Sequence, residues 1–483
     1  MASSTLFAVE REGTTASSLP WIEVCKNSPY FRTEEGDIWT PIGQNDGISW
    51  PELRGLYRRQ DVGKAEAYLK LLADHGVTCL RLMLEYSQGT QHHFEYPVGQ
   101  PRPDMVQLWD DLFAMCERYG LRILLTPFDT FWLWLKWHRH PYNAANGGPC
   151  EDRTKILLCK DTREAIKARL AFATERWGSS GALFAWDIWN EIHPSFAQDS
   201  AECFEEFVHD LSVFLRKKEL EIHGRAHPQT VSVFGPHMVL DKHIPETIFR
   251  HSALDFASTH FYEEGTIDFP QNTVDAALAT ARLMRDALVE LRDLRPFLDS
   301  EHGPIHTYKD HHITLPEPFD DEYFRHMQWA HFCAGGAGGG MRWPNRSPHS
   351  LTLGMRKAQR GLAGFLPLMD WQSFRRTNWN EEVRVSHPAV KASASGDCYQ
   401  ALVWLLRTDQ IGPEGMLCRD AEPVAVNLQL PCLVNGTYQI TAWNTMDGKP
   451  VAEFAVENTT GPGLSFQAPG LVTDLAFAIR RLP

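Results

Sequence analysis

Over most of its length the chain alternates between two patterns of apolar residues. Runs that are almost wholly apolar, such as 77–84 (VTCLRLML) and 182–190 (ALFAWDIWN), are separated by stretches with helical apolar spacing, such as 106–120. Such runs are typical of parallel strands buried on both faces, and the stretches between them predict amphipathic helices. After a polar leader, eight strands are predicted, at 38–45, 77–84, 121–129, 182–190, 230–236, 254–262, 296–303 and 337–344.

Eight strands that are each followed by a helix favour a closed (β/α)8 barrel, also called a TIM barrel. The alternative is an open, doubly wound sheet, which would normally carry a glycine-rich phosphate loop after an early strand. The glycines of 335–340 do not form such a loop, because they follow a predicted helix and precede a strand. We therefore expect an α/β protein with a TIM barrel.

The pattern changes near residue 380, where helical spacing ends. Short alternating runs such as 423–430 and 437–445 follow, separated by turn sequences such as NGT and MDGKP. This pattern predicts an antiparallel β-sandwich. We expect a barrel domain with its leader over 1–376 and an accessory sandwich domain over 377–483.

Composition and charge restrict the class of protein further. The chain has 483 residues, of which 43% are hydrophobic and 22% charged, as in soluble globular proteins. Its formal net charge of -14 argues against nucleic acid or an anionic membrane as a partner, because both require a basic surface. No run is long and apolar enough for a membrane span, and the N-terminus lacks the pattern of a signal peptide. Ten scattered cysteines fit a reducing compartment, so we expect a cytoplasmic protein.

Polar and aromatic residues stand where the predicted strands end. In TIM barrels the chemistry takes place at the carboxyl ends of the strands. The residues in these positions are Arg81, Asp129, Asn190, Glu191, His260, Tyr262, Glu301, Arg342 and Trp343. Two of them are glutamates, Glu191 after the fourth strand and Glu301 after the seventh, on opposite sides of the predicted barrel mouth. Glycoside hydrolysis needs such a pair, one to protonate the leaving oxygen and one to attack the sugar or activate water.

The motif W-x-x-x-N-E that ends at Glu191, the sequence DSEHGP around Glu301, and the His-x-Tyr pair of His260 and Tyr262 resemble the retaining glycosidases built on (β/α)8 barrels. The nearest likeness is to glycoside hydrolase family 5, of the cellulase, mannanase and β-mannosidase type. It covers roughly 35–375, and two further positions, Arg81 and Trp343, match the same plan.

The resemblance implies a role for each of these residues and requires no cofactor. Glu191 would be the general acid/base and Glu301 the nucleophile, with Asn190 binding the sugar 2-hydroxyl. Arg81 and Tyr262 would keep Glu301 ionised and aligned, because a nearby cation and hydrogen bonds favour the charged form. His260 and Trp343 would contact the substrate.

The sequence departs from the usual family pattern in the loops. Ile192 and His193 stand where a proline usually follows the Asn-Glu pair, and the segment 129–154 is unusually long. We expect this segment to fold over the barrel mouth and to bring Asp129 and Trp132 to the substrate. That would favour exo action on short β-linked oligosaccharides or glycosides with gluco- or manno-configured sugars.

Two other functions compete with this interpretation. A glycosidase barrel can serve as a non-catalytic carbohydrate-binding or scaffold protein, and a transglycosylase can use the same residues. We expect no metal site, because the histidines at 92–93, 138–140 and 311–312 lie in polar loops typical of exposed side chains. The sandwich has no regular row of aromatic residues, so we expect it to brace the barrel rather than bind polysaccharide by itself.

Overall fold

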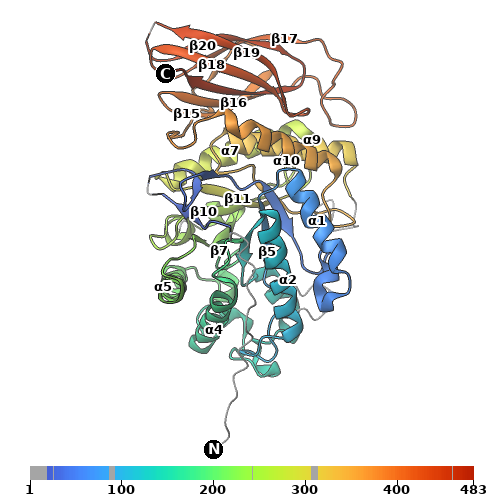
Figure 1. The fold of residues 1–483 in the computed structure, drawn as a ribbon, viewed down its shortest axis with the longest axis vertical. Helices are drawn as coiled ribbons and strands as arrows, with labels where there is room; N and C mark the ends of the chain where they lie inside the picture. Colours follow the sequence, from blue (N-terminus) through green and yellow to red (C-terminus); the bar gives the residue numbers. More distant parts are fainter. Residues whose placement is uncertain (1–18, 26, 86–92, 242, 306–313, 460) are drawn as a thin grey trace, which may run out of the picture.

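The computed structural model describes residues 19–483 except 26, 86–92, 242, 306–313 and 460. A TIM barrel forms one part of the molecule and an antiparallel β-sandwich the other, as the sequence pattern predicts (Figure 1). Among the described residues, no helix is long and apolar enough to cross a membrane.

The barrel sheet consists of parallel strands, and the fifth strand is interrupted at Val231. Its two pieces pair with opposite ends of the sheet, β8 with β7 and β9 with β10, so the sheet closes around the barrel. The strands are β4 (Gly43–Asp46), β5 (Cys79–Met83), β6 (Arg122–Thr126), β7 (Leu183–Asp187), β8 (Gln229–Thr230), β9 (Ser232–Phe234), β10 (Ala257–Phe261), β11 (Phe297–His302) and β12 (Met341–Arg342).

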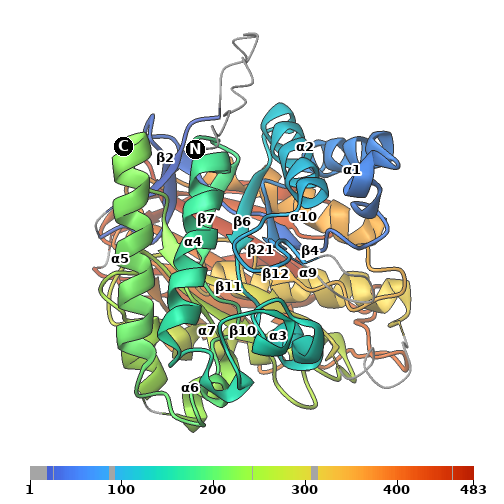
Figure 2. The ribbon, with the colours of Figure 1, turned by 90° about the horizontal axis from the view of Figure 1, so that it is seen from below.

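Helices surround these strands, with α4 and α5 on one side of the barrel and α1 and α2 on another (Figure 2). They begin and end at local signals. Asp61 accepts a hydrogen bond from the Lys64 amide at the start of α1, and Gly120 ends α2 in the left-handed conformation. The α-helices of the barrel are α1 (Val62–Asp74), α2 (Pro103–Tyr119), α3 (Thr130–Lys136), α4 (Lys160–Trp177), α5 (Phe204–His223), α6 (Gly235–Leu240), α7 (Thr273–Leu291), α9 (Glu317–Cys333) and α10 (Leu353–Phe365). Shorter turns of 3-10 or π helix are η1 (Arg54–Arg59), η2 (Trp137–Arg139), η3 (Ala144–Asn146), η4 (Arg153–Lys155), η5 (Pro194–Phe196), η6 (Pro245–Phe249) and η7 (Leu366–Leu368).

The expectation of a polar leader is wrong for residues 22–33, and residues 38–39, expected in the first barrel strand, belong to another sheet. Together they form an antiparallel sheet of β1 (Ile22–Val24), β2 (Phe31–Thr33) and β3 (Ile38–Trp39). The side chain of Phe31 is fully buried and packs edge-on against Phe184 and Phe256, at ring-centroid distances of 4.8 and 5.2 Å. Phe184 lies near the start of β7, so this small sheet covers the amino end of the barrel and leaves the carboxyl end for chemistry.

The sandwich consists of one sheet of six strands and one of three, with an apolar core between them. The larger sheet contains β13 (Thr377–Asn378), β15 (Val390–Gly396), β16 (Gln400–Arg407), β21 (Asp474–Arg481), β18 (Gly436–Asn444) and β19 (Lys449–Asn458). The smaller sheet contains β14 (Arg384–Val385), β17 (Val424–Leu430) and β20 (Leu464–Leu471).

The larger sheet packs against barrel helices α7, α9 and α10 (Figure 1). Trp404 and Trp443 of the sandwich belong to the same buried cluster as Trp329 of α9 and Phe365 of α10. Such an apolar contact between the two parts favours a fixed relative position, because separating them would expose large aromatic side chains to water.

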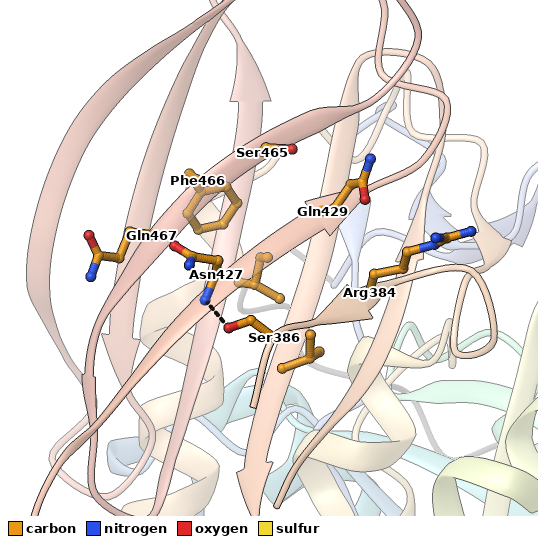
Figure 3. A pocket seen from close by; sticks show the side chains of 9 residues that line it. Arg384, Ser386, Asn427, Gln429, Ser465, Phe466 and Gln467 are labelled. Atoms are coloured by element: carbon orange, nitrogen blue, oxygen red, sulfur yellow. Dashed lines mark hydrogen bonds between the residues drawn. The ribbon is translucent and has the colours of Figure 1, made fainter. Parts of the chain in front are cut away.

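A shallow pocket of about 520 Å³ lies on the smaller sheet, away from these helices (Figure 3). Its exposed lining is mostly amide and hydroxyl side chains, such as Asn427, Gln429 and Gln467, and the backbone N–H of Asn427 donates to Ser386 Oγ. Phe466 is the aromatic residue of the lining, and its side chain is buried in the sandwich core. The pocket therefore presents no open aromatic face for a sugar ring.

Candidate active site

Arg81, on β5, is the centre of a buried hydrogen-bond network at the carboxyl end of the barrel. Its Nη2 donates to Asp187 Oδ2 at 2.7 Å and to Asn190 Oδ1 at 2.5 Å. Its Nη1 donates to Glu301 Oε2 at 2.9 Å and to Asn45 Oδ1 at 2.8 Å. Three strands, β4, β7 and β11, thus contribute four partners to one guanidinium group, which is 1% exposed. A buried cation needs such compensation, and two carboxylates provide it here.

Glu301 lies on β11 and is held from two sides. Tyr262, just after β10, donates its hydroxyl hydrogen to Glu301 Oε1 at 2.7 Å, while Arg81 bonds the other oxygen. Both carboxylate oxygens therefore have fixed partners, and the side chain is 8% exposed. Arg81 and Tyr262 thus both contact the carboxylate of Glu301.

Glu191 follows β7 and is paired with His260 of β10. The Glu191 Oε1 atom lies 2.7 Å from His260 Nδ1, and His260 Nε2 lies 3.1 Å from Ser300 Oγ. One carboxylate oxygen of Glu191, one of Glu301 and a ring nitrogen of His260 all lie within 4.8 Å of one another. The two glutamates predicted from distant parts of the sequence therefore meet in one site.

The backbone of Glu191 is in the left-handed region, with φ of 50°. A residue other than glycine pays about 1–3 kcal/mol for such a conformation, which persists only where the surroundings enforce it. Ser232 Oγ accepts the Glu191 amide hydrogen at 3.2 Å, and Thr130 Oγ1 donates to the Glu191 carbonyl at 2.7 Å. These bonds fix the carboxyl group relative to the strand ends.

Burial raises the pKa of both glutamates, but their surroundings differ. The pKa of Glu191 is raised to about 7 by desolvation, with the Arg81 cation opposing the shift. Desolvation also raises the pKa of Glu301, while Arg81 and the Tyr262 hydroxyl, which bond it directly, lower it. Burial lowers the pKa of His260 to about 4, so its ring is neutral at pH 7. Glu191 is the better proton donor of the pair, and Glu301 the better anion.

Asn190 and Asp129 support the site from the neighbouring strand ends. Asn190 Nδ2 donates to Asp129 Oδ1 at 2.5 Å, and the second oxygen of Asp129 accepts the Trp132 amide hydrogen at 2.6 Å as the cap of α3. Burial raises the pKa of Asp129 to about 6. Asp129 therefore orients Asn190 and begins a helix, which ties the long segment after β6 to the site.

Trp132 is 8% exposed and packs in the hydrophobic core, whereas Trp134, two residues later, is 48% exposed. The helix turns the two rings to different sides. Trp343 follows β12, is partly buried, and meets the edge of Trp50 at a centroid distance of 5.2 Å. Trp50 lies in the loop after β4. The sequence interpretation missed it because it considered the residues at the strand ends.

Other residues of the site were also missed, although some gave a signal. Asp187 is the one carboxylate in the run 182–190 before the Asn-Glu pair, and a lone charge in an apolar strand requires a partner such as Arg81. Asn45, Ser232 and Ser300 gave no comparable signal, because single polar residues at strand ends are common.

The expectation of exposed loop histidines is wrong for His93 and His140, which are 5% and 2% exposed. They lie with Glu85 in a cluster whose N and O atoms approach within 4.8 Å. The Tyr142 amide donates to His140 Nδ1, so in the neutral ring Nε2 carries the proton and donates to Glu85. This tautomer cannot offer Nε2 to a metal, and the arrangement is a hydrogen-bond network. His92, His311 and His312 lie outside the described residues.

Known proteins were compared with the chain in three ways. A scan against models of protein families found no match, and a search of curated proteins found none. Solved structures do match. A glycoside hydrolase family 5 protein from Bacteroides vulgatus ATCC 8482 has a TM-score of 0.62 at 12% identity, covering 96% of this chain and 95% of its own.

Two further structures agree with this match. A protein described as a glycoside hydrolase has a TM-score of 0.57 at 13% identity and covers 96% of this chain and 99% of its own. A family 5 mannosidase (E202A mutant) from Rhizomucor miehei, in complex with mannosyl-fructose, has a TM-score of 0.52 at 14% identity, covering 71% and 97%. At these identities the likeness concerns the fold. The resemblance predicted from the sequence is thereby confirmed at the level of architecture: the chain has the fold of family 5 glycoside hydrolases.

Proposed function

We propose that the protein is a retaining β-glycoside hydrolase in which Glu301 is the nucleophile and Glu191 the general acid/base. The observation that carries this proposal is the approach of one buried and one partly buried carboxylate within 4.8 Å at the carboxyl end of the barrel, with Arg81 bonded to the buried one. The likeness in fold to family 5 glycoside hydrolases supports it further.

The environment of each carboxyl group matches its proposed duty. In the first step Glu301 attacks the anomeric carbon and forms a glycosyl-enzyme ester, while Glu191 gives its proton to the departing oxygen. In the second step Glu191 removes a proton from water, and the water oxygen releases the sugar from Glu301. His260 bonds Oε1 of Glu191, which leaves the other oxygen to carry and exchange the proton.

The distance between the carboxylates favours retention over inversion. Retaining enzymes hold the two groups about 5–5.5 Å apart, whereas inverting enzymes need about 6.5–9.5 Å to admit a water molecule. One carboxylate oxygen of Glu191 and one of Glu301 lie within 4.8 Å of each other, which fits the shorter spacing better than the longer one. Direct attack by Glu301 is therefore the proposed route.

We also propose exo action on short β-linked oligosaccharides or glycosides of gluco- or manno-configured sugars. The long segment after β6 is bonded to the site through Asp129 and Thr130, which restricts the space around Glu191. Release of monosaccharide without a rapid fall in the viscosity of a soluble polysaccharide would support exo action.

All ten cysteines are unpaired, which supports a reducing compartment such as the cytoplasm.

Trapping of the glycosyl enzyme tests the mechanism directly. A 2-deoxy-2-fluoroglycosyl fluoride should label the protein once, and peptide mass spectrometry should find the label on Glu301. The gluco and manno reagents together also report the sugar configuration, and the Glu301→Gln variant is the control that should remain unlabelled. A label on Glu191 would exchange the two roles. If neither reagent labels the protein, and it hydrolyses neither an aryl β-glucoside nor an aryl β-mannoside, a non-catalytic binding protein would be favoured.

A further inference from the structure

Helix α3 (Thr130–Lys136) carries an unusual exposed apolar surface. Phe131, Trp134 and Leu135 are 49%, 48% and 49% exposed, and their spacing of three and four residues places them on one side of the helix. Trp132 and Leu133 occupy the buried side. We call the three exposed side chains the α3 surface. Single exposed apolar residues are common, but a contiguous group often marks a binding site.

The α3 surface is attached to the acid/base side of the candidate site. Thr130, in the first turn of α3, donates to the Glu191 carbonyl at 2.7 Å and accepts from Trp189 Nε1 at 2.9 Å. The Trp134 ring lies 6.2 Å from that of His193, two residues after Glu191. These contacts leave α3 little freedom to move relative to Glu191.

Arg153, in the short helix η4, holds Trp134 in place. Its guanidinium lies 5.6 Å from the centre of the Trp134 ring, and its Nη1 donates to the Trp134 carbonyl at 3.2 Å. An exposed ring that is fixed in this way loses little conformational entropy when it binds a ligand.

The leaving group of a glycoside must lie beside the general acid, because the acid protonates the oxygen that joins it to the sugar. Under the proposed function, the group that departs from the site therefore meets the α3 surface. A sugar in this position would need hydrogen-bond donors and acceptors, yet the side chains of Phe131 and Leu135 have none. An alkyl or aryl group needs only apolar contact area.

We propose that the α3 surface binds an apolar aglycone, so that the preferred substrate is an amphiphilic β-glycoside with an alkyl or aryl aglycone. This inference rests on the proposed function and narrows its substrate class. Each methylene that α3 buries would raise kcat/KM by up to about fourfold, which corresponds to about 0.8 kcal/mol.

Alkyl glycosides of increasing chain length test the proposal. The kcat/KM values of the methyl, butyl and octyl β-glycosides of the accepted sugar would be measured below their micelle concentrations. The β-glycosyl fluoride of the same sugar, without the 2-fluoro group of the trapping reagent, serves as a substrate that has no aglycone. The test variant replaces the α3 surface by Phe131→Gln, Trp134→Gln and Leu135→Gln. The control variant makes the same change at three exposed apolar residues of α5, Val213, Leu220 and Ile222.

We expect the native protein and the α5 variant to favour the octyl over the methyl glycoside by at least tenfold. In the α3 variant this preference should fall below threefold, with turnover of the fluoride within twofold of the native value. Circular dichroism checks that both variants fold.

Four results would overturn the inference while leaving the proposed function intact. The first is turnover of the fluoride with no dependence on chain length, and the second is a dependence that survives in the α3 variant. The third is a greater gain from a disaccharide aglycone than from octyl. A native dimer in sedimentation that dissociates in the α3 variant would identify the surface as a contact between two copies and would also overturn it. No turnover of any fluoride would instead overturn the proposed function together with this inference.

Discussion

At the scale of single residues, Arg81 gives the two glutamates different electrostatic surroundings. Arg81 donates a hydrogen bond to the carboxylate of Glu301. Its positive charge also acts on Glu191, and it donates to the side chain of Asn190, the residue before Glu191. A cation in contact stabilises the ionised form of one carboxyl group more than that of its neighbour. Arg81 thus favours the ionised form of Glu301 more than that of Glu191, as the proposed roles require.

Loss of each glutamate should affect a different chemical step. Glu301→Ala removes the proposed nucleophile, so glycosylation should almost stop even with a 2,4-dinitrophenyl leaving group. Glu191→Ala removes the proposed acid, which this leaving group hardly needs, so the first step should persist while deglycosylation slows. Azide needs no base and should restore turnover in Glu191→Ala with a β-glycosyl azide as product. Nuclear magnetic resonance of the product distinguishes this from an α-azide, the only azide expected from Glu301→Ala.

The raised pKa of Glu191 predicts an alkaline limit to activity. The acid must be protonated, so kcat/KM for a poor leaving group such as 4-methoxyphenyl should fall as the pH rises above about 7. The fall should be absent with 2,4-dinitrophenyl, which departs without a proton. Profiles of kcat/KM from pH 4 to 9 for both substrates measure this. The same alkaline fall for both would assign the limit to another group.

At the scale of elements, the small sheet β1–β3 completes the barrel core. Phe31 fills the amino end of the barrel against side chains from the strand starts. The candidate site lies at the opposite end. The side chains that complete the core and those of the candidate site therefore lie at different ends of the same strands.

Removal of the Phe31 ring should destabilise the protein without changing its chemistry. Phe31→Ala should lower the free energy of unfolding by about 3–5 kcal/mol, because it leaves a cavity in a closely packed core. Phe269→Ala, at a residue that is 48% exposed, should cost less than about 0.5 kcal/mol. Urea titration measures both, and KM should be unchanged in each. An effect of Phe31→Ala no larger than that of Phe269→Ala would show that the small sheet does not contribute to the barrel core.

At the scale of the whole molecule, the barrel and the sandwich share a buried polar contact within their apolar interface. Arg325 Nη1 on α9 donates to Asp474 Oδ1 on β21 at 2.6 Å, and Trp404 Nε1 donates to the other oxygen at 2.9 Å. Burial alone would raise the pKa of Asp474, but Arg325 and His326 outweigh it and hold the pKa well below its usual range. This contact supports our proposal that residues 377–483 brace the barrel.

Neutralisation of Asp474 should loosen the two parts. Asp474→Asn leaves the buried Arg325 cation without the closer of its two carboxylate partners and should cost about 3–5 kcal/mol in the free energy of unfolding. Because the pKa of Asp474 is lowered in the folded state, its stabilisation is present above its unfolded value of about 4 and is lost as the pH falls below it. Urea unfolding at pH 7 and pH 3 should show this loss in the native protein and less of it in the variant. Asp420→Asn, at an exposed site of the sandwich, is the matched control, and an equal effect from both substitutions would contradict the proposal.

The sequence by itself determined the order of strands and helices and the position of the paired glutamates. Continuous apolar runs such as 182–190 predict strands that are buried on both faces. A carboxylate at the end of such a run indicates that the strand ends at a polar site. Only the tertiary structure decided which partners meet. Arg81 bonds Asp187 and Glu301 over separations of 106 and 220 residues, which no local pattern records. The same holds for Trp132 and Trp134, because the packing of α3 buries one ring and exposes the other. Local periodicity specifies elements, whereas the roles of single side chains depend on how those elements pack.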